Sequence, residues 1–185
     1  MKTTLKSIRS FNPCVDSWKM LLAHFGKKRA DKTEVRIVDI LDLLGLEDAL
    51  WALRAVEGHD REIRLFAVAC ARRVQYLMTD PRSLNALAVA GRFANGQATK
   101  GELVAADKAA RDAARDAAGW AAYWAAYWAA GLAADWAAEM EACAADDREA
   151  ERAWQAEELR RVCLAIEAGE DPYQKKEETI NPTMP

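Results

Sequence analysis

A run of adjacent alanine pairs constrains this chain more than any other feature of its sequence. The pairs recur every four residues from Ala105-Ala106 to Ala137-Ala138, nine times without a slip. Alanine is the best helix former and a poor strand former, so the repeat predicts helix throughout. Because a helical turn takes about 3.6 residues, the alanine stripe moves by about 40° around the axis with each repeat. No single flat partner stays against such a stripe, so we expect different neighbours along the helix, or a break at Gly119 and Gly131.

The composition extends this expectation to the whole chain. Hydrophobic residues make up 51% of the 185 residues, but alanine alone supplies 39 of them, so large apolar side chains are scarce. Nine Gly and five Pro are too few for a fold built on many tight turns. We therefore exclude an all-β fold and predict an all-α protein: a bundle of short helices, then the long alanine-rich helix, then a C-terminal helix that packs back.

Punctuation residues divide the first hundred residues into five short amphipathic helices. Asn12-Pro13 is a typical helix start, with an N-cap followed by proline, and Asp60 is placed to cap a later helix. Thr79-Asp80-Pro81 restarts the helical pattern, and Asn95-Gly96 favours a turn that ends it. The segment 27–35 reads as a polar connector between helices.

The alanine-rich helix begins with the spacing of a capping box. Thr99 and Glu102 are three residues apart, so each side chain reaches a free backbone amide of the other residue. Between the alanine pairs, charged residues predict solvated turns up to 116, and aromatic residues predict buried turns over 120–128. The segment 146–168 is amphipathic, with an apolar stripe made of Trp154, Leu159, Val162, Cys163 and Ile166.

These patterns predict three parts. Residues 1–98 form an N-terminal helical bundle, residues 99–168 form the alanine-repeat helix and its return helix around one shared core, and residues 169–185 form a flexible tail.

Charge is distributed unevenly along the chain, although its net value is −3. Residues 1–100 carry 17 basic and 11 acidic side chains, and residues 101–185 carry 9 and 18, so the two parts are +6 and −9. Nine of the basic side chains lie in residues 1–36 against three acidic ones, and we treat this segment as a basic arm. Such an arm suits an anionic partner.

Residues that carry chemistry are few. Glycine-rich phosphate loops, nucleophile elbows and zinc-spaced Cys/His sets are all missing from the sequence. His59-Asp60 resembles the metal-binding pair of HD phosphohydrolases, but His24 is the one histidine upstream and the position of Asp60 also suits a helix cap. We therefore expect no catalytic residue, no cofactor and no metal, and a protein that is not an enzyme.

Location follows from three features of the sequence. The four cysteines are widely spaced, which favours reduced thiols in a cytoplasm. Lys6 and Arg9 interrupt the N-terminal apolar residues, so the segment is unlike a secretory signal. Residues 117–134 are uncharged over 18 positions, but ten are alanine and one is leucine, so we expect no membrane helix. A cytoplasmic protein is the prediction.

A protein without chemistry of its own acts by binding, and the charged and aromatic residues are the candidates for contact. The acidic candidates lie at the end of the alanine repeat and after it: Asp135, Glu139, Glu141, Asp146 and Asp147. The basic candidates are Lys27, Lys28 and Arg29. If the protein binds nucleic acid, we expect the contact to be made by the basic arm alone. Tyr123 and Tyr127 are the aromatic candidates, since exposed aromatic rings contribute strongly to interfaces.

Several segments together resemble a known family. They are FNPC at 11–14, ALWALRAV at 49–56, REIRLFAVACARRV at 61–74, TDPRS at 79–83 and ANGQAT at 94–99, followed by the alanine array. In this order they resemble the alanine-rich, all-helical immunity proteins of bacteria, prophages and phages. The resemblance implies a protein that neutralises a partner by binding it: a cognate toxin, or a component of a bacterial antiviral defence system if the gene belongs to a phage.

Two other functions stay open at this point. The alanine faces of two chains could pack together at short distance, which would give a self-assembling helical scaffold or a homodimer. A weaker alternative is an HD-like metal phosphohydrolase that uses His59 and Asp60.

Overall fold

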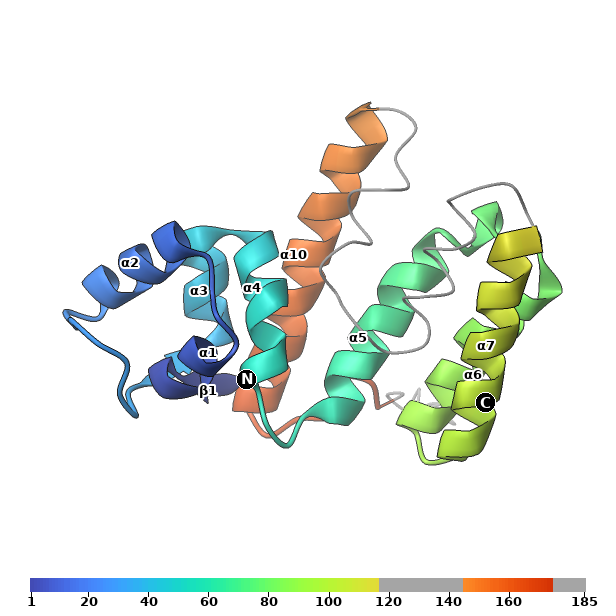
Figure 1. Ribbon diagram of the computed structural model, residues 1–185, viewed down its shortest axis with the longest axis horizontal. Helices are drawn as coiled ribbons and strands as arrows, with labels where there is room; N and C mark the ends of the chain where they lie inside the picture. Colours follow the sequence, from blue (N-terminus) through green and yellow to red (C-terminus); the bar gives the residue numbers. More distant parts are fainter. Residues whose placement is uncertain (117–144, 175–185) are drawn as a thin grey trace, which may run out of the picture.

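The computed structural model describes residues 1–116 and 145–174 of the chain. Helices dominate these ranges, so the predicted all-α class is confirmed (Figure 1). The elements in chain order are β1 (Lys2–Thr4), α1 (Leu5–Ser10), α2 (Val15–His24), β2 (Glu34–Arg36), α3 (Ile37–Leu44), α4 (Leu46–Ala52), the 3-10 turn η1 (Leu53–Ala55), α5 (Asp60–Arg73), the 3-10 turn η2 (Gln75–Leu77), α6 (Pro81–Ala94), α7 (Lys100–Asp116) and α10 (Ala145–Glu167). Gly119 and Gly131 lie outside the described residues, so the break expected there stays a prediction.

A two-stranded sheet departs from the expectation for the N-terminal segment. β1 and β2 pair antiparallel, with Thr3 opposite Val35. Both side chains are buried, and the Thr3 hydroxyl donates to the carbonyl of Ala55. The connector predicted at 27–35 therefore ends in a strand. Residues 1–36 are an integral part of the bundle and not an arm, because Met1, Leu5 and Val35 lie in its core.

Local capping signals explain most helix boundaries. The helical pattern restarts at Thr79-Asp80-Pro81 as predicted: the Asp80 carboxylate accepts the backbone N–H of Arg82 at 2.8 Å, and Pro81 takes the first helical position. The capping box is also confirmed: Glu102 accepts the Thr99 N–H at 2.7 Å, and the Thr99 hydroxyl accepts the Glu102 N–H at 3.2 Å. The Asn95-Gly96 turn ends α6 as expected.

Two predicted caps are wrong. Asn12 does not cap α2. It has a φ of +55°, a left-handed conformation that asparagine tolerates, and its N–H donates to the carbonyl of Arg9. α2 starts later, with Cys14 as its N-cap. Asp60 is the first residue of α5, and His59 holds the N-cap position.

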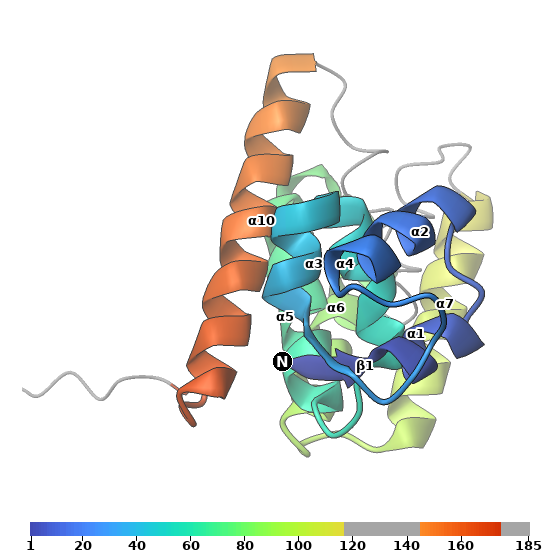
Figure 2. The same ribbon diagram turned by 90° about the vertical axis from the view of Figure 1, so that its left-hand side faces the viewer.

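The larger of two buried clusters, here called the terminal core, joins the beginning of the chain to α10. Its members are Met1, Leu5, Ile8, Leu21, Val35, Ile37, Val38, Ile40, Leu41, Ala49, Leu50, Ala52, Leu53, Ala55, Phe66, Cys70, Leu159, Val162 and Cys163. The ammonium group of Met1 lies within 3.3 Å of both the Cys163 carbonyl and a Glu167 carboxylate oxygen. α10 packs along α3, α4 and α5, with the N-terminus beside it (Figures 1 and 2). The predicted apolar stripe of this helix is thus its buried face.

The second cluster, here called the alanine core, lies on the other side of α5, where α6 and α7 pack (Figure 1). Its members are Val68, Ala71, Met78, Ala86, Leu87, Val89, Ala90, Leu103, Ala106 and Ala110. In the first two alanine pairs of α7 the second member is buried, Ala106 and then Ala110. In the third pair the first member, Ala113, is buried. The buried position therefore drifts across the repeat, as a four-residue repeat on a 3.6-residue helix requires.

The charged residues between these alanine pairs form ion pairs along the surface of α7. Arg111 reaches Asp107 at 2.8 Å, and Lys108, largely exposed, reaches Asp112 at 3.4 Å. The described residues of α7 and α10 contribute to different clusters. Because residues 117–144 are outside the description, the division into parts 1–98, 99–168 and 169–185 stays a prediction.

The beginning of the segment expected to be a flexible tail is ordered. Asp171 pairs with Arg61 at 2.9 Å, and Tyr173 packs against the terminal core. The Arg161 guanidinium lies 5.5 Å from the Tyr173 ring centroid. Residues 170–174 are therefore bound to α5 and α10.

Candidate protein-interaction surface

A loop at residues 26–33 connects α2 to β2 and carries all three predicted basic candidates. Backbone hydrogen bonds hold this loop against the start of α1: the Leu5 N–H donates to Thr33 at 3.1 Å and the Lys6 N–H to Asp31 at 2.8 Å. These bonds bring the first turn of α1 beside the loop. β1 precedes α1 and β2 follows the loop, so the pairing of these two strands also holds the loop beside α1.

Lys27 forms an ion pair within the loop itself. Its ammonium group lies 2.7 Å from the Asp31 carboxylate, which also accepts the backbone N–H of Thr33 at 2.9 Å. The Lys27 hydrogen bond, together with those from Thr33, holds the pKa of Asp31 far below its usual range. Lys27 was predicted as a contact residue, but its charge is already matched within the loop.

Four of the other eight cations of residues 1–36 also have partners among the described residues. Lys2 pairs with Glu34 and Lys19 with Asp16 at the exposed surface. The Arg36 guanidinium binds Asp39 and also lies 3.6 Å from Glu167. Arg9 lies over the Trp18 ring, 5.8 Å from its centroid, where a guanidinium gains from the ring quadrupole.

Four cations have neither an acidic nor an aromatic partner among the described residues: Lys6, Lys28, Arg29 and Lys32. All four side chains are exposed, and the backbone hydrogen bonds bring the loop that carries Lys28, Arg29 and Lys32 beside the first turn of α1, which carries Lys6. We call these four residues the basic surface. Lys28 and Arg29 were predicted as contact residues. Lys6 and Lys32 were not, because their proximity depends on pairing between two three-residue strands that no local pattern announces.

The acidic and aromatic candidates fall mainly outside what the structure describes. This applies to Asp135, Glu139 and Glu141, and to Tyr123 and Tyr127. The backbones of Asp146 and Asp147 lie in the first turn of α10, while their side chains are outside the description. A shared acidic surface made by these residues therefore stays a prediction.

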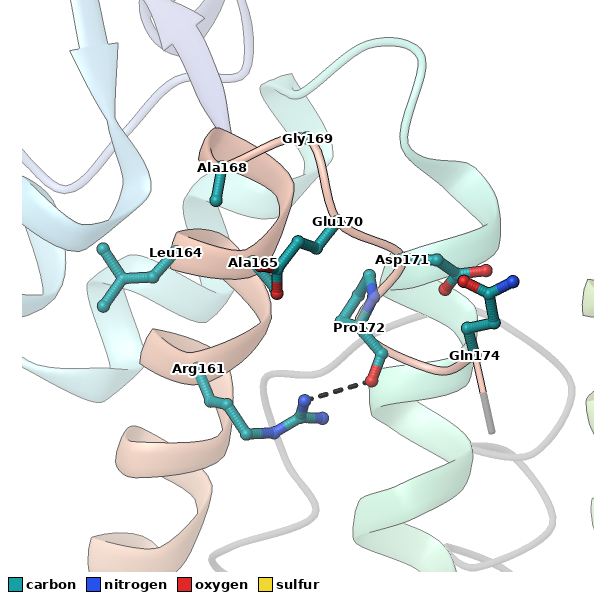
Figure 3. A pocket seen from close by; sticks show the side chains of 9 residues that line it. All are labelled: Arg161, Leu164, Ala165, Ala168, Gly169, Glu170, Asp171, Pro172 and Gln174. Carbon is teal, nitrogen blue, oxygen red and sulfur yellow. Dashed lines mark hydrogen bonds between the residues drawn. The ribbon is translucent and has the colours of Figure 1, made fainter. Parts of the chain in front are cut away.

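An open groove of about 850 Å³ follows the last turns of α10. It is lined by Arg161, Leu164, Ala165, Ala168, Gly169, Glu170, Asp171, Pro172 and Gln174. Figure 3 shows the Arg161 guanidinium donating to the Pro172 carbonyl, at 3.0 Å, while Leu164 and Asp171 point to opposite sides. The Arg161 guanidinium also donates to the Glu158 carboxylate. The lining side chains do not converge on a common point, and none is a histidine, cysteine or serine that could act as a base or nucleophile.

The residues of the HD-like alternative have other neighbours. His59 Nδ1 lies 3.7 Å from Glu62, one turn along the chain, and the His24 ring packs edge-on against Phe25. Among residues 1–116 and 145–174, no three His, Cys, Asp or Glu side chains gather as metal ligands would. Burial raises the pKa of the Cys163 thiol to about 11, and that of Cys70 higher still, so both are inert core residues.

No helix in the described part of the chain has both the length and the apolar character needed to cross a membrane. Comparisons with protein-family models, with curated proteins and with solved structures find no match to this chain.

Proposed function

We propose that this chain is a non-enzymatic, cytoplasmic binding protein that neutralises a partner protein in a bacterial cell. The partner is a toxin, or a bacterial defence component if the gene belongs to a phage, as the family resemblance implies. The basic surface docks on an acidic face of that partner. The observation that carries the proposal is the contrast between four exposed cations that have no partner among the described residues and the paired cations around them.

Physical reasoning supports an interaction role for these charges. Exposed ion pairs contribute about 0–1 kcal/mol to stability, so folding gains little from any charge at such positions. Grouped like charges repel one another and raise the local potential, which attracts an oppositely charged partner and speeds association. A loop fastened by backbone hydrogen bonds presents those charges with little ordering cost on binding.

The predicted acidic set, from Asp135 to Asp147, offers a second contact in the same proposal. It would occupy a basic surface of the partner, such as one that binds nucleic acid. Its contribution is tested separately, by replacing the five acidic residues with their amides.

The test is affinity capture from host lysate with two charge variants. The first replaces Lys28, Arg29 and Lys32 by glutamine. The matched control replaces Arg72, Arg92 and Lys100, which are also exposed and form no salt bridge among the described residues, but are spread over α5, α6 and α7 across the molecule (Figure 1). We expect wild type and control to recover the same protein, and the first variant to lose it.

Neutralisation is tested with the recovered protein. Its activity should fall when wild type or the control variant is added, and should persist when the Lys28/Arg29/Lys32 variant is added. Equal recovery by both variants would contradict the assigned surface. A recovered protein whose activity is unchanged by wild type would contradict the neutralising role.

A further inference from the structure

A small depression between α2 and α4 is separate from the basic surface and from the groove on α10. Its lining is mainly apolar: Ile8, Pro13, Ser17, Trp18, Leu21, Ile40, Leu44, Asp48, Trp51 and Ala52. Its volume of about 20 Å³ accommodates roughly one water-sized group. Binding sites for small groups are typically apolar with a few placed polar atoms, and Asp48 is the charged member of this lining.

The Asp48 carboxylate is half-buried, and only some of its hydrogen-bond acceptor positions are occupied by described residues. Ser17 Oγ donates to its Oδ2 at 3.0 Å, which joins α2 to α4. No cation among the described residues pairs with it, whereas the neighbouring Glu47 is bound by Arg152. Burial raises the pKa of Asp48, and the charge of Glu47 adds to the effect. A carboxylate has about four acceptor positions, so an oxygen of Asp48 remains available for a donor.

Two indole rings line the same depression, from α2 and from α4. Trp18 and Trp51 are both half-buried, and both already attract a cation at the surface. Arg9 lies 5.8 Å from the centroid of Trp18, and Arg54 lies 4.8 Å from that of Trp51. Tryptophan is the best aromatic partner for a cation, so indole rings beside a carboxylate suit a cationic group.

We propose that this depression binds a primary ammonium group, from a small amine or from a lysine side chain of another polypeptide. An ammonium head is a compact point charge of about the size of water, which the volume admits, whereas guanidinium and trimethylammonium groups are larger. The ammonium group donates to Asp48, and the Trp18 and Trp51 rings flank it. This inference does not depend on the basic surface or on the proposed function.

The test follows the indole N–H signals of Trp18 and Trp51 by NMR, assigned with Trp18→Phe and Trp51→Phe variants. Methylammonium is titrated at constant ionic strength and should shift both signals to saturation. Tetramethylammonium is the size control and should shift neither. Nα-acetyl-lysine amide, compared with its Nε-acetylated form, tests the polypeptide source. Tighter binding of the lysine amide than of methylammonium assigns the site to a lysine side chain, and equal or weaker binding assigns it to a free amine.

Two variants separate binding from folding. Asp48→Asn keeps an acceptor for Ser17 but removes the charge, and should weaken methylammonium binding about tenfold or more. Ser17→Ala removes the link between α2 and α4 but keeps the carboxylate, and should retain binding. The proposal is overturned if methylammonium gives no saturable shift, if Asp48→Asn binds it as well as wild type, or if tetramethylammonium binds equally.

Discussion

The terminal core and the alanine core achieve burial in different ways. The terminal core uses large side chains brought together from opposite ends of the chain, such as Leu5 from α1 and Leu159 from α10. Five of the ten members of the alanine core are alanines, and they lie on helices that follow one another, α5, α6 and α7. Large side chains contribute more hydrophobic free energy, and small ones allow close helix approach. The large side chains of the terminal core should therefore be sensitive to a loss of volume, and the alanine positions of the alanine core to a gain of volume.

Removing volume from the terminal core should have the largest effect. Leu159 is 0% exposed, and Leu159→Ala should lower the free energy of unfolding by about 2–5 kcal/mol, because a cavity remains. Chemical denaturation measures this loss. The matched control is Leu164→Ala on the same helix, where the side chain is 46% exposed and the change should stay within about 0.5 kcal/mol. Equal losses in the two variants would mean that α10 is not packed as described.

Adding volume should be the damaging change in the alanine core. Ala110→Leu inserts a large side chain at a fully buried position, and should cost about 1–3 kcal/mol of unfolding free energy through overpacking. Ala105 belongs to the same repeat but is exposed, so Ala105→Leu serves as the control and should be nearly neutral. If both substitutions are tolerated in thermal denaturation, close packing of α7 on α6 is wrong.

A smaller effect is expected at the start of α7. Thr99→Ala removes the cap and should reduce stability by about 1 kcal/mol, while Thr99→Ser should retain most of it. The N–H and hydroxyl of Thr99 hold the pKa of Glu102 below its ordinary value of 4.5. The cap therefore contributes above that pH and loses its contribution as the pH falls through the lowered pKa of the folded state. Urea denaturation at neutral and acidic pH measures both effects, and a loss in Thr99→Ala that is the same at both would exclude this role for Glu102.

How far the sequence predicts the fold differs between local and distant features. The Asp80 cap, the Thr99–Glu102 box and the apolar stripe of α10 are predictable, because each depends on residues within a few positions of one another. The pairing of β1 with β2 is not predictable, because two three-residue strands about thirty residues apart carry no periodic signal. The misplaced start of α2 has a local cause, since Asn12 suits a left-handed turn as well as a cap.

The candidate sites show the same division. Lys28 and Arg29 are predictable from their place in a charged run. The pairing of Lys27 with Asp31 is not, because every residue in such a run has several charged neighbours. Lys6 joins Lys28 and Arg29 through hydrogen bonds between α1 and the loop. Asp48 and Trp51 are three residues apart on α4, yet their approach to Trp18 depends on how α2 packs.

The most direct test of the central claim is the salt dependence of association between this chain and the captured partner. Exposed charges are screened beyond about 8 Å at physiological ionic strength, so the association rate should fall steeply with salt for wild type and for the Arg72/Arg92/Lys100 control. For the Lys28/Arg29/Lys32 variant the rate should be low at all salt concentrations, with unfolding free energy within about 0.5 kcal/mol of wild type. The same steep dependence in all three proteins would contradict recognition through the basic surface.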